Sequence, residues 1–396
     1  MIDLFKEKQD CCGCTACINI CPKSAISMTS DEEGFRYPQI DKTQCNECGL
    51  CKKVCAFQNG YDTAENFKTP HVYAVKHRDE KVRMNSSSGG AFTAISDYIL
   101  NLNGVIYGVA FDEKFNVIHQ RAETMKETEL FRGSKYVQSD LKNIFQRLRA
   151  DLADGRWVLF TGTPCQAAGL NSFLLNTDKS KLLICDLVCY GTPSPLIWKE
   201  HVRFLEKKMK SGVDEYYFRS KVKGWLISTV QVKFKNGKCD YKSALSQAHK
   251  TLFFSGNMMR PSCYNCKYTN FNRPSDISIA DFWGIEKHMP EFFDNKGVSL
   301  VLVNSQKGRN VFETIITSIE YRESNTDTCK HSPLHRQTKL PPRRNAFWKD
   351  YKKNGYGFVI KKYGGYGFKN RIKRTAGKFL RKTGLLNLVK NILGRK

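Results

Sequence analysis

The sequence has few of the features that direct a protein into or across a membrane. The N-terminal residues Met-Ile-Asp-Leu-Phe-Lys contain no apolar signal core. No stretch approaches the roughly 18 uninterrupted apolar residues that a membrane-spanning helix needs. We therefore expect a cytoplasmic protein. Its 396 residues are enough for two or three domains with a substantial core.

Two common nucleotide-binding motifs are also missing. The dinucleotide fingerprint G-x-G-x-x-G is absent, because in its nearest approximation, at Gly355 and Gly357, Ile360 replaces the third glycine and no predicted strand precedes. A Walker A loop is absent as well. An organic redox cofactor would therefore need another kind of site.

Acidic residues are scarce near the C-terminus. From Arg343 onwards, 17 Lys and Arg accompany a single acid, Asp350, so this tail supplies 16 of the net charge of +26. The rest of the chain is only mildly basic, whereas nucleic-acid-binding proteins spread basic residues over a folded face. We expect no nucleic-acid partner and a specialised tail.

Cysteine, by contrast, is abundant, and eight of the sixteen cysteines form two runs of identical spacing, C-x2-C-x2-C-x3-C. The runs are Cys11, Cys14, Cys17 and Cys21, then Cys45, Cys48, Cys51 and Cys55. Pro22 follows the first run and Ala56 the second. This is the spacing of bacterial ferredoxins, in which the fourth cysteine of each run binds the other cluster. Thiolate ligands of this kind require a reducing compartment.

The spacing predicts two 4Fe–4S clusters. One is bound by Cys11, Cys14, Cys17 and Cys55, and its twin by Cys45, Cys48, Cys51 and Cys21. Zinc is the competing interpretation, but zinc sites use two pairs of ligands, and neither run divides in that way. Cys12 lies outside the spacing and is interpreted as a spare thiol.

Beyond a polar linker at residues 59–70, strands alternate with helices. Strands are predicted at 71–75, 104–111, 116–121, 157–161, 182–189, 216–219, 228–235, 238–241, 277–280 and 299–304. Helices are predicted at 91–102, 140–152, from Pro164, at 196–209 and at 309–319. Asn236-Gly237 predicts a type I′ hairpin turn. The fold class is therefore α/β, with an α+β ferredoxin-like N-terminal domain, a body built on a largely parallel or mixed sheet, and a basic helical tail. The expected divisions are 1–60, 70–153, 154–325 and 326–396.

Ser86, Ser87, Ser88, Gly89 and Gly90 precede the predicted helix at 91–102. Small residues at a helix start let backbone amides and hydroxyls converge on an anion, and the helix dipole adds attraction. If these amides hold an anionic group, a side chain at Gly89 would crowd it. The alternative is an ordinary serine cap followed by flexible glycines.

Four cysteines of the body stand at strand–loop junctions or in a C-x2-C pair: Cys165, Cys189, Cys263 and Cys266. Loops that follow parallel strands gather at one edge of a sheet, so Cys165 and Cys189 can meet, and the pair can complete a four-thiolate site. A third 4Fe–4S cluster, a structural zinc and a nucleophilic Cys165 at a helix N-terminus are three competing interpretations. Cys185, Cys239 and Cys329 are interpreted as structural.

Several motifs occur in an order that resembles a known family. After the ferredoxin pair come Ser-Ser-Ser-Gly-Gly-Ala-Phe, Phe-Arg-Gly-Ser-Lys-Tyr-Val-Gln-Ser (131–139), Thr-Gly-Thr-Pro-Cys-Gln (161–166), Cys-Tyr-Gly-Thr-Pro-Ser-Pro (189–195), Arg-Pro-Ser-Cys-Tyr-Asn-Cys (260–266) and Ala-Asp-Phe-Trp-Gly-Ile (280–285). Over roughly residues 1–310 the chain resembles the coenzyme F420 hydrogenase/dehydrogenase beta-subunit family. It departs from the familiar Cys-His-Gly at Tyr190, which removes a proton carrier.

The resemblance implies an FAD site of non-Rossmann type and a 4Fe–4S cluster in the body. It favours cluster ligation by Cys165, Cys189, Cys263 and Cys266, and cofactor binding by the Ser86–Gly90 loop. It also implies flavin or substrate contacts from Arg132, Ser134, Lys135, Tyr136, Gln138 and Asp281. The alternative for the 132–138 group is a charged turn before a helix, and for Asp281 a turn at a strand end.

The sequence thus favours an iron–sulfur flavoenzyme that passes electrons between a flavin-linked hydride donor or acceptor and low-potential 4Fe–4S clusters. One alternative is a non-catalytic electron-transfer subunit of a larger oxidoreductase, and a less favoured one is a zinc-binding interaction protein. The expected partner is a redox protein or a small-molecule hydride donor or acceptor.

From Phe368 onwards, apolar residues recur at helical spacing among lysines and arginines. This pattern is typical of a helix that lies in a membrane interface, so we expect peripheral contact with an anionic surface, most simply the inner face of the membrane. The alternatives are a helix packed on its own body and contact with an acidic redox partner.

Overall fold

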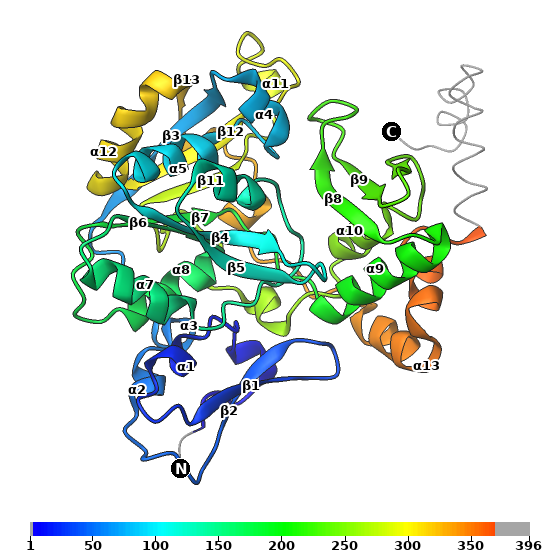
Figure 1. Cartoon of the computed structure of the whole chain (residues 1–396), viewed down its shortest axis with the longest axis horizontal. Helices are drawn as coiled ribbons and strands as arrows, with labels where there is room; N and C mark the ends of the chain where they lie inside the picture. The colour runs from blue at the N-terminus through cyan, green and yellow to red at the C-terminus, as the bar shows by residue number, and fades with distance from the viewer. Residues whose placement is uncertain (1–2, 369–396) are drawn as a thin grey trace.

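The computed structural model describes residues 3–368, which form an N-terminal region, a large sheet covered by helices, and a smaller layer of sheet and helices (Figure 1). In the N-terminal region, β1 (Ile26–Ser30) and β2 (Arg36–Ile40) pair as an antiparallel hairpin. The short helices α1 (Ala16–Ile20), α2 (Leu50–Lys53) and α3 (Ala56–Asn59) accompany the two cysteine runs. The expected α+β arrangement is present.

An eight-stranded sheet organises the body. Its strands are β3 (Asn66–His77), β4 (Val105–Phe111), β5 (Val117–Ala122), β6 (Val158–Gly162), β7 (Leu182–Leu187), β11 (Ile277–Asp281), β12 (Ser299–Ser305) and β13 (Ile319–Ser324), in the order β13-β3-β12-β11-β7-β6-β4-β5. The neighbours β4, β6, β7 and β11 run parallel, and the outer strands are antiparallel. The predicted α/β class with a mixed sheet is confirmed.

Helices cover both faces of this sheet (Figure 1). The helices α7 (Ile144–Ala153) and α8 (Pro164–Phe173) pack on the face that carries Val158 and Phe160, whereas α5 (Ala91–Asn101) and α12 (Gln306–Ile315) pack on the face that carries Leu159. Alternate side chains of a strand point to opposite faces, so a strand covered on both sides is apolar throughout. The apolar core on the α8 side also includes α3, which joins the N-terminal region to the body.

A second layer lies beside the large sheet. It contains β8 (Val213–Ser220), β9 (Thr229–Phe234) and β10 (Cys239–Asp240), with α9 (Pro195–Met209), α10 (Ala248–Phe254) and α13 (Arg344–Lys362). Buried aromatic side chains from several of these elements, among them Trp198, Phe218 and Phe347, fill its core. Three short helices complete the fold: α4 (Glu80–Asn85), α6 (Met125–Thr128) and α11 (Ile285–His288).

Three sequence expectations need correction. The first strand of the body begins at Asn66, so part of the predicted linker is strand. The helix predicted over 309–319 ends at Ile315, and Ile319 opens strand β13. The hairpin at Asn236-Gly237 is present, but only Gly237 has a positive φ, of 78°, whereas a type I′ turn needs positive φ at both central residues.

The predicted interfacial helix begins at Phe368, and the rest of it lies outside the described residues, so its contact with an anionic surface stays a prediction. Phe368 itself is exposed. Over residues 3–368, no helix has both the length and the apolar character needed to cross a membrane.

Candidate functional site

The N-terminal fold brings the last cysteine of the second run to the first run. Burial, together with the charges of Cys14 and Cys11, raises the pKa of Cys55 to about 11. Burial also raises the pKa of Cys17, together with the charges of Cys14, Cys11 and Cys55. Thiols affect one another's pKa in this way only when they lie close together. The predicted binding of Cys55 to the cluster of the first run requires the same proximity.

The second set of thiols lies nearer to solvent. Burial raises the pKa of Cys51, and the charges of Cys48 and Cys21 add to the shift, so these three side chains are neighbours. Cys48 is exposed and Cys45 is half-buried. The site predicted for Cys45, Cys48, Cys51 and Cys21 is therefore the outer one of the pair.

The first run packs directly on the body. An added Cβ at Gly169, in α8, would lie 2.7 Å from Sγ of Cys14, so only glycine fits there. The buried Cys12 thiol lies close to the sulfurs of Cys14 and Cys165. Its interaction with Cys165 is the main cause that lowers the pKa of Cys165 to about 7. Cys12, interpreted from the sequence as a spare thiol, thus lies between the first N-terminal run and Cys165 of the body.

The four body cysteines come together from three parts of the chain. Cys165 lies in the first turn of α8 and Cys189 follows β7. Cys263 lies within the short turn at 261–265, and Cys266 follows it directly. Burial raises the pKa of Cys189, and the charges of Cys263, Cys165 and Cys266 raise it further. Burial and the charge of Cys165 raise the pKa of Cys266 to about 12.

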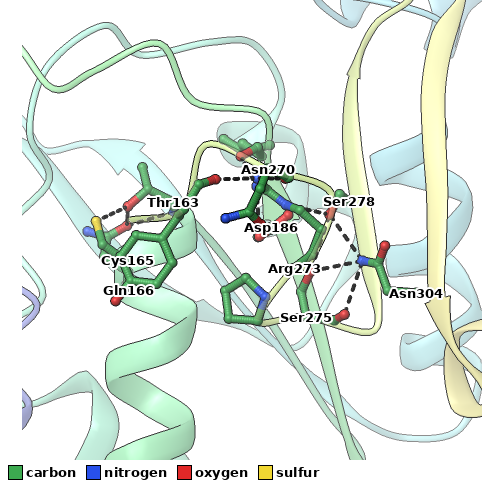
Figure 2. Close-up of polar contacts among 12 residues, drawn as sticks. Thr163, Cys165, Gln166, Asp186, Asn270, Arg273, Ser275, Ser278 and Asn304 are labelled. Atoms are coloured by element: carbon green, nitrogen blue, oxygen red, sulfur yellow. Dashed lines mark hydrogen bonds and ion pairs between the residues drawn. The ribbon is translucent and has the colours of Figure 1, made fainter. Parts of the chain in front are cut away.

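A buried ion pair fixes the loops that carry these cysteines (Figure 2). Arg273, which follows the Cys263–Cys266 segment, donates to the Asp186 carboxylate at the end of β7, 2.9 Å away, and to the carbonyl of Leu187 at 3.1 Å. Its other nitrogens donate to Ser278 and to the carbonyls of Tyr268 and Asn270. The guanidinium therefore ties the loop after Cys266 to the strand that leads to Cys189.

Among residues 3–368, no group of three or more His, Cys, Asp or Glu side chains is arranged to bind a single metal ion.

A cavity of about 600 Å³ opens beside the body cysteines. Most of the side chains that the sequence assigned to cofactor binding line it: Ser86, Ser87, Ser88, Gly90, Arg132, Ser134, Lys135, Tyr136 and Asp281. Cys189 lines it as well, together with Thr163 and Gln166 on either side of Cys165. The cavity is in the size range of cofactor sites, and one of its walls is shared with the body cysteines.

Gly89 and Gln138 are not among the lining residues. A Cβ at Gly89 would lie 2.1 Å from the carbonyl oxygen of Val75 and 2.5 Å from the backbone nitrogen of Ser299. The glycine is thus needed for close approach to the sheet, rather than to make room in the cavity. Gln138 instead donates to the carbonyl of Cys12 at 3.3 Å, beside the N-terminal cysteines.

Side-chain contacts hold the serine loop in place. The Ser87 hydroxyl accepts a hydrogen bond from the backbone nitrogen of Ser134 at 2.8 Å, which joins two walls of the cavity. Ser88 donates to the carbonyl of Val298 at 2.7 Å, and Lys221 donates to the carbonyl of Ser88 at 2.6 Å. The loop before α5 is therefore a fixed structure.

Aromatic and basic side chains missed by the sequence complete the cavity. Arg219, Trp283, Lys250 and Phe253 all line it. The Arg219 guanidinium lies over the Trp283 ring, 4.8 Å from its centroid, and Trp283 stacks on Trp225. Trp283 stands in the 280–285 motif, where only Asp281 was singled out, whereas Arg219, Lys250 and Phe253 lie in no motif and have no sequence signal.

Two lysines at the cavity have depressed pKa values. Burial lowers the pKa of Lys135 to about 7, and its ammonium group donates to the carbonyls of Leu130 and Arg132, each 2.8 Å away. Burial and the charge of Arg219 lower the pKa of Lys250 to about 8. With Arg132 and Arg219, these lysines give the cavity an excess of basic groups, which suits an anionic ligand.

Comparison with known proteins finds matches for two parts of the chain. Residues 10–59 match the 4Fe–4S dicluster domain, and residues 155–328 match the family described as the C terminus of the coenzyme F420 hydrogenase/dehydrogenase beta subunit. An uncharacterized ferredoxin of Methanocaldococcus jannaschii is 32% identical over 54 residues, which are 14% of this chain and 69% of that protein.

One solved structure is similar over a longer stretch. A chain of the F420-reducing [NiFe] hydrogenase complex from Methanosarcina barkeri has 16% sequence identity and a TM-score of 0.45, and the match covers 77% of this chain and 96% of that one. The dicluster match identifies residues 10–59 as a domain that binds two 4Fe–4S clusters. With this domain at its N-terminal side, the chain contains, over residues 155–328, the C-terminal region of the coenzyme F420 hydrogenase/dehydrogenase beta-subunit family.

Proposed function

We propose that the protein is an iron–sulfur flavoprotein oxidoreductase with a third 4Fe–4S cluster and one FAD. The observation that carries this proposal is the wall shared by the cavity and the body cysteines. Cys189 belongs to both, and Thr163, which lines the cavity, lies within 3.2 Å of Sγ of Cys165. A flavin in this cavity would lie next to the third cluster.

The third cluster would be held by Cys165, Cys189, Cys263 and Cys266. The effects of these thiols on one another's pKa support a common site, and Asp186 and Arg273 stabilise the loops that carry them. Thr192 donates its backbone N–H to Sγ of Cys263 at 3.3 Å, a contact that stabilises a thiolate. Cys12, next to Cys14 and Cys165, supports a short route from the N-terminal clusters to this one.

The FAD would be held by the cavity residues of the serine loop, the 132–136 segment and Asp281. The N-terminus of α5 and the basic groups Arg132 and Lys135 suit its phosphates. Tyr136 stacks on Phe253 with ring centroids 4.8 Å apart, so one wall is flat and aromatic. A bound flavin converts two-electron hydride chemistry into single-electron transfer, and the residues here would orient it and exclude water.

The chain's own reaction would link a small-molecule hydride donor or acceptor at the cavity with a low-potential redox protein at the exposed outer cysteines. We propose the division into residues 1–60, 70–153, 154–325 and 326–396, with the cavity formed between the two central parts. Residues from both parts, Ser87 and Asp281 among them, line the same space.

The second candidate is an electron-transfer subunit that needs a partner subunit for its chemistry. The family match favours it, since the family is defined by beta subunits of hydrogenases and dehydrogenases. Anaerobically purified chain, loaded with iron, sulfide and FAD, should reduce artificial dyes with a hydride donor if the first candidate is correct. A fully loaded chain that turns over only after a partner subunit is added would support the second.

A further inference from the structure

Among the residues that the structure describes, Arg260 is a buried cation without an acidic partner. Its relative exposure is 0%, and three other arginines, Arg83, Arg219 and Arg273, are buried within residues 3–368. Each of these three forms an ion pair with an aspartate. The hydrogen bonds of Arg260 go instead to two backbone carbonyls, one amide oxygen and one sulfur. A buried charge is costly unless another charge compensates it.

The contacts of Arg260 converge on the first cysteine of the chain. Its Nε donates to the carbonyl of Cys11 at 2.8 Å, and one Nη lies 3.6 Å from Sγ of the same residue. The other Nη donates to the side-chain oxygen of Gln138 at 3.1 Å. The ring of Tyr37 lies beneath the guanidinium, with its centroid 4.1 Å away. The guanidinium group of Arg260 is therefore fixed in one orientation.

The loop around Cys11 is built to accept this arginine. A Cβ at Gly13 would lie 3.0 Å from Nη1 of Arg260 and 2.8 Å from Nε2 of Gln138. Gly13 also has a φ of 75°, which favours glycine. Arg260 is bonded to the body as well, because its carbonyl accepts from the backbone nitrogen of Cys263 at 2.9 Å. One side chain thus connects the first cysteine run to the segment that carries Cys263.

We propose that Arg260 sets the reduction potential of the cluster bound by Cys11, raising it relative to the outer cluster bound by Cys45, Cys48, Cys51 and Cys21. A 4Fe–4S cluster with four thiolates carries a net negative charge, and reduction by one electron makes that charge larger. A fixed guanidinium that donates to a ligand sulfur stabilises the reduced form. This inference rests on the proposed ligation by Cys11, but not on the third cluster or the FAD.

An electron that enters at the exposed outer cluster would therefore move towards the body, because the inner cluster has the higher reduction potential. Arg260 is a positioning and tuning residue and touches no substrate.

The test is an anaerobic redox titration followed by EPR at low temperature, with iron analysis of every protein. Cys11→Ser identifies the signal of the inner cluster. The solution potential is held at the midpoint potential of the wild-type inner cluster. At that potential, the ratio of reduced to oxidised inner cluster should be about tenfold lower in Arg260→Gln than in the wild type. This corresponds to a midpoint potential about 59 mV lower for a one-electron couple. Arg260→Lys keeps the charge and should restore most of the ratio. The exposed Arg203→Gln is the matched control, and it should leave the ratio unchanged.

Gln138→Glu is a second and nearly isosteric variant. It places a carboxylate where the amide oxygen now accepts from Arg260, so it neutralises the cation without removing it. The same inner-cluster ratio should fall. A variant that keeps its full iron content and an unchanged ratio of reduced to oxidised inner cluster overturns the inference. Loss of the inner-cluster EPR signal from both Arg260→Gln and Gln138→Glu would show a purely structural role, and would also overturn it. A wild-type protein without FAD or a third cluster would refute the proposed function and leave this result intact.

Discussion

The guanidinium of Arg219 and the carboxylate of Asp281 form a buried ion pair at the wall of the cavity. The indole of Trp225 donates to the same carboxylate at 2.8 Å. The backbone carbonyl of Asp281 accepts a hydrogen bond from the His331 ring. Asp281, at the end of β11, thus connects strand β8 and the segment after β13 at the wall of the cavity. The sequence predicted a cofactor contact for Asp281, and that role is still untested.

Asp281→Asn should destabilise the protein, because it leaves the Arg219 cation buried and unpaired. We expect a loss of about 3 kcal/mol in the free energy of unfolding, measured by denaturant titration of the apoprotein. Glu200→Gln, which breaks the exposed pair with Arg203, should cost less than about 0.5 kcal/mol. Equal losses in the two variants would contradict the importance assigned to the buried pair.

Ser87→Ala should lower flavin content and leave iron unchanged. The variant removes the acceptor that ties the serine loop to the backbone of Ser134, so the two walls of the cavity separate more easily. The cost in unfolding free energy should be only about 1 kcal/mol. Flavin and iron are measured on the same purified sample, with the exposed Ser180→Ala as control. Full flavin occupancy in Ser87→Ala would show that the loop does not hold the cofactor.

Cys165→Ser should remove about four of about twelve irons and the EPR signal of one cluster, while the N-terminal pair remains. The control is Cys12→Ala, at a buried thiol in contact with Cys165 that is not assigned as a ligand. It should keep all the iron. An unchanged iron content in Cys165→Ser would refute the third cluster. An equal loss of iron from Cys165→Ser and Cys12→Ala would refute the assignment of Cys165 as a ligand and Cys12 as a neighbour that binds no iron.

The stability of the apoprotein relative to a Lys135→Gln variant should rise as pH increases from about 7 to about 10. Burial lowers the pKa of Lys135 to about 7, whereas an unfolded lysine has a pKa of about 10.4. At this residue the unfolded chain binds more protons between these values, so Lys135 adds a positive contribution to the slope of unfolding free energy against pH. Lys135→Gln should remove that contribution. Buried thiols with raised pKa values, such as Cys55 and Cys266, act in the opposite sense in both proteins and cancel in the comparison.

The measurement is a series of denaturant titrations across that pH range. The exposed Lys114→Gln is the control and should keep the wild-type slope. A slope in Lys135→Gln equal to that of the wild type would mean that Lys135 keeps an ordinary pKa in the folded protein.

The sequence was most informative where chemistry depends on local spacing. The two cysteine runs identified the dicluster domain, which the comparison confirms, because three ligands of each cluster lie within a few residues. Buried strands such as β6 and β7 were found from their apolar runs. Strand β13 was missed, because its exposed side chains at the sheet edge give it an irregular, polar pattern.

Contacts between distant segments could not be predicted. Helix α13 was missed because its burial depends on α9 and α10, and a kink at Gly355 interrupts its apolar pattern. Arg260 lies in a motif that the sequence singled out only for its cysteines, and nothing in that motif shows that residue 260 reaches Cys11. For Gly89, the sequence predicted a role that the structure does not show. It lies in the predicted loop, but its lack of a side chain serves the sheet.

The most direct test of the account is a count of cofactors in the wild-type protein. The chain is purified under strict exclusion of oxygen, and iron, acid-labile sulfide, zinc and FAD are measured per chain. The account predicts about twelve irons and as many sulfides, in three cubanes, with one FAD and no zinc. About eight irons with no flavin would contradict the third cluster and the flavin site, and would leave only a dicluster ferredoxin domain joined to a body without cofactors.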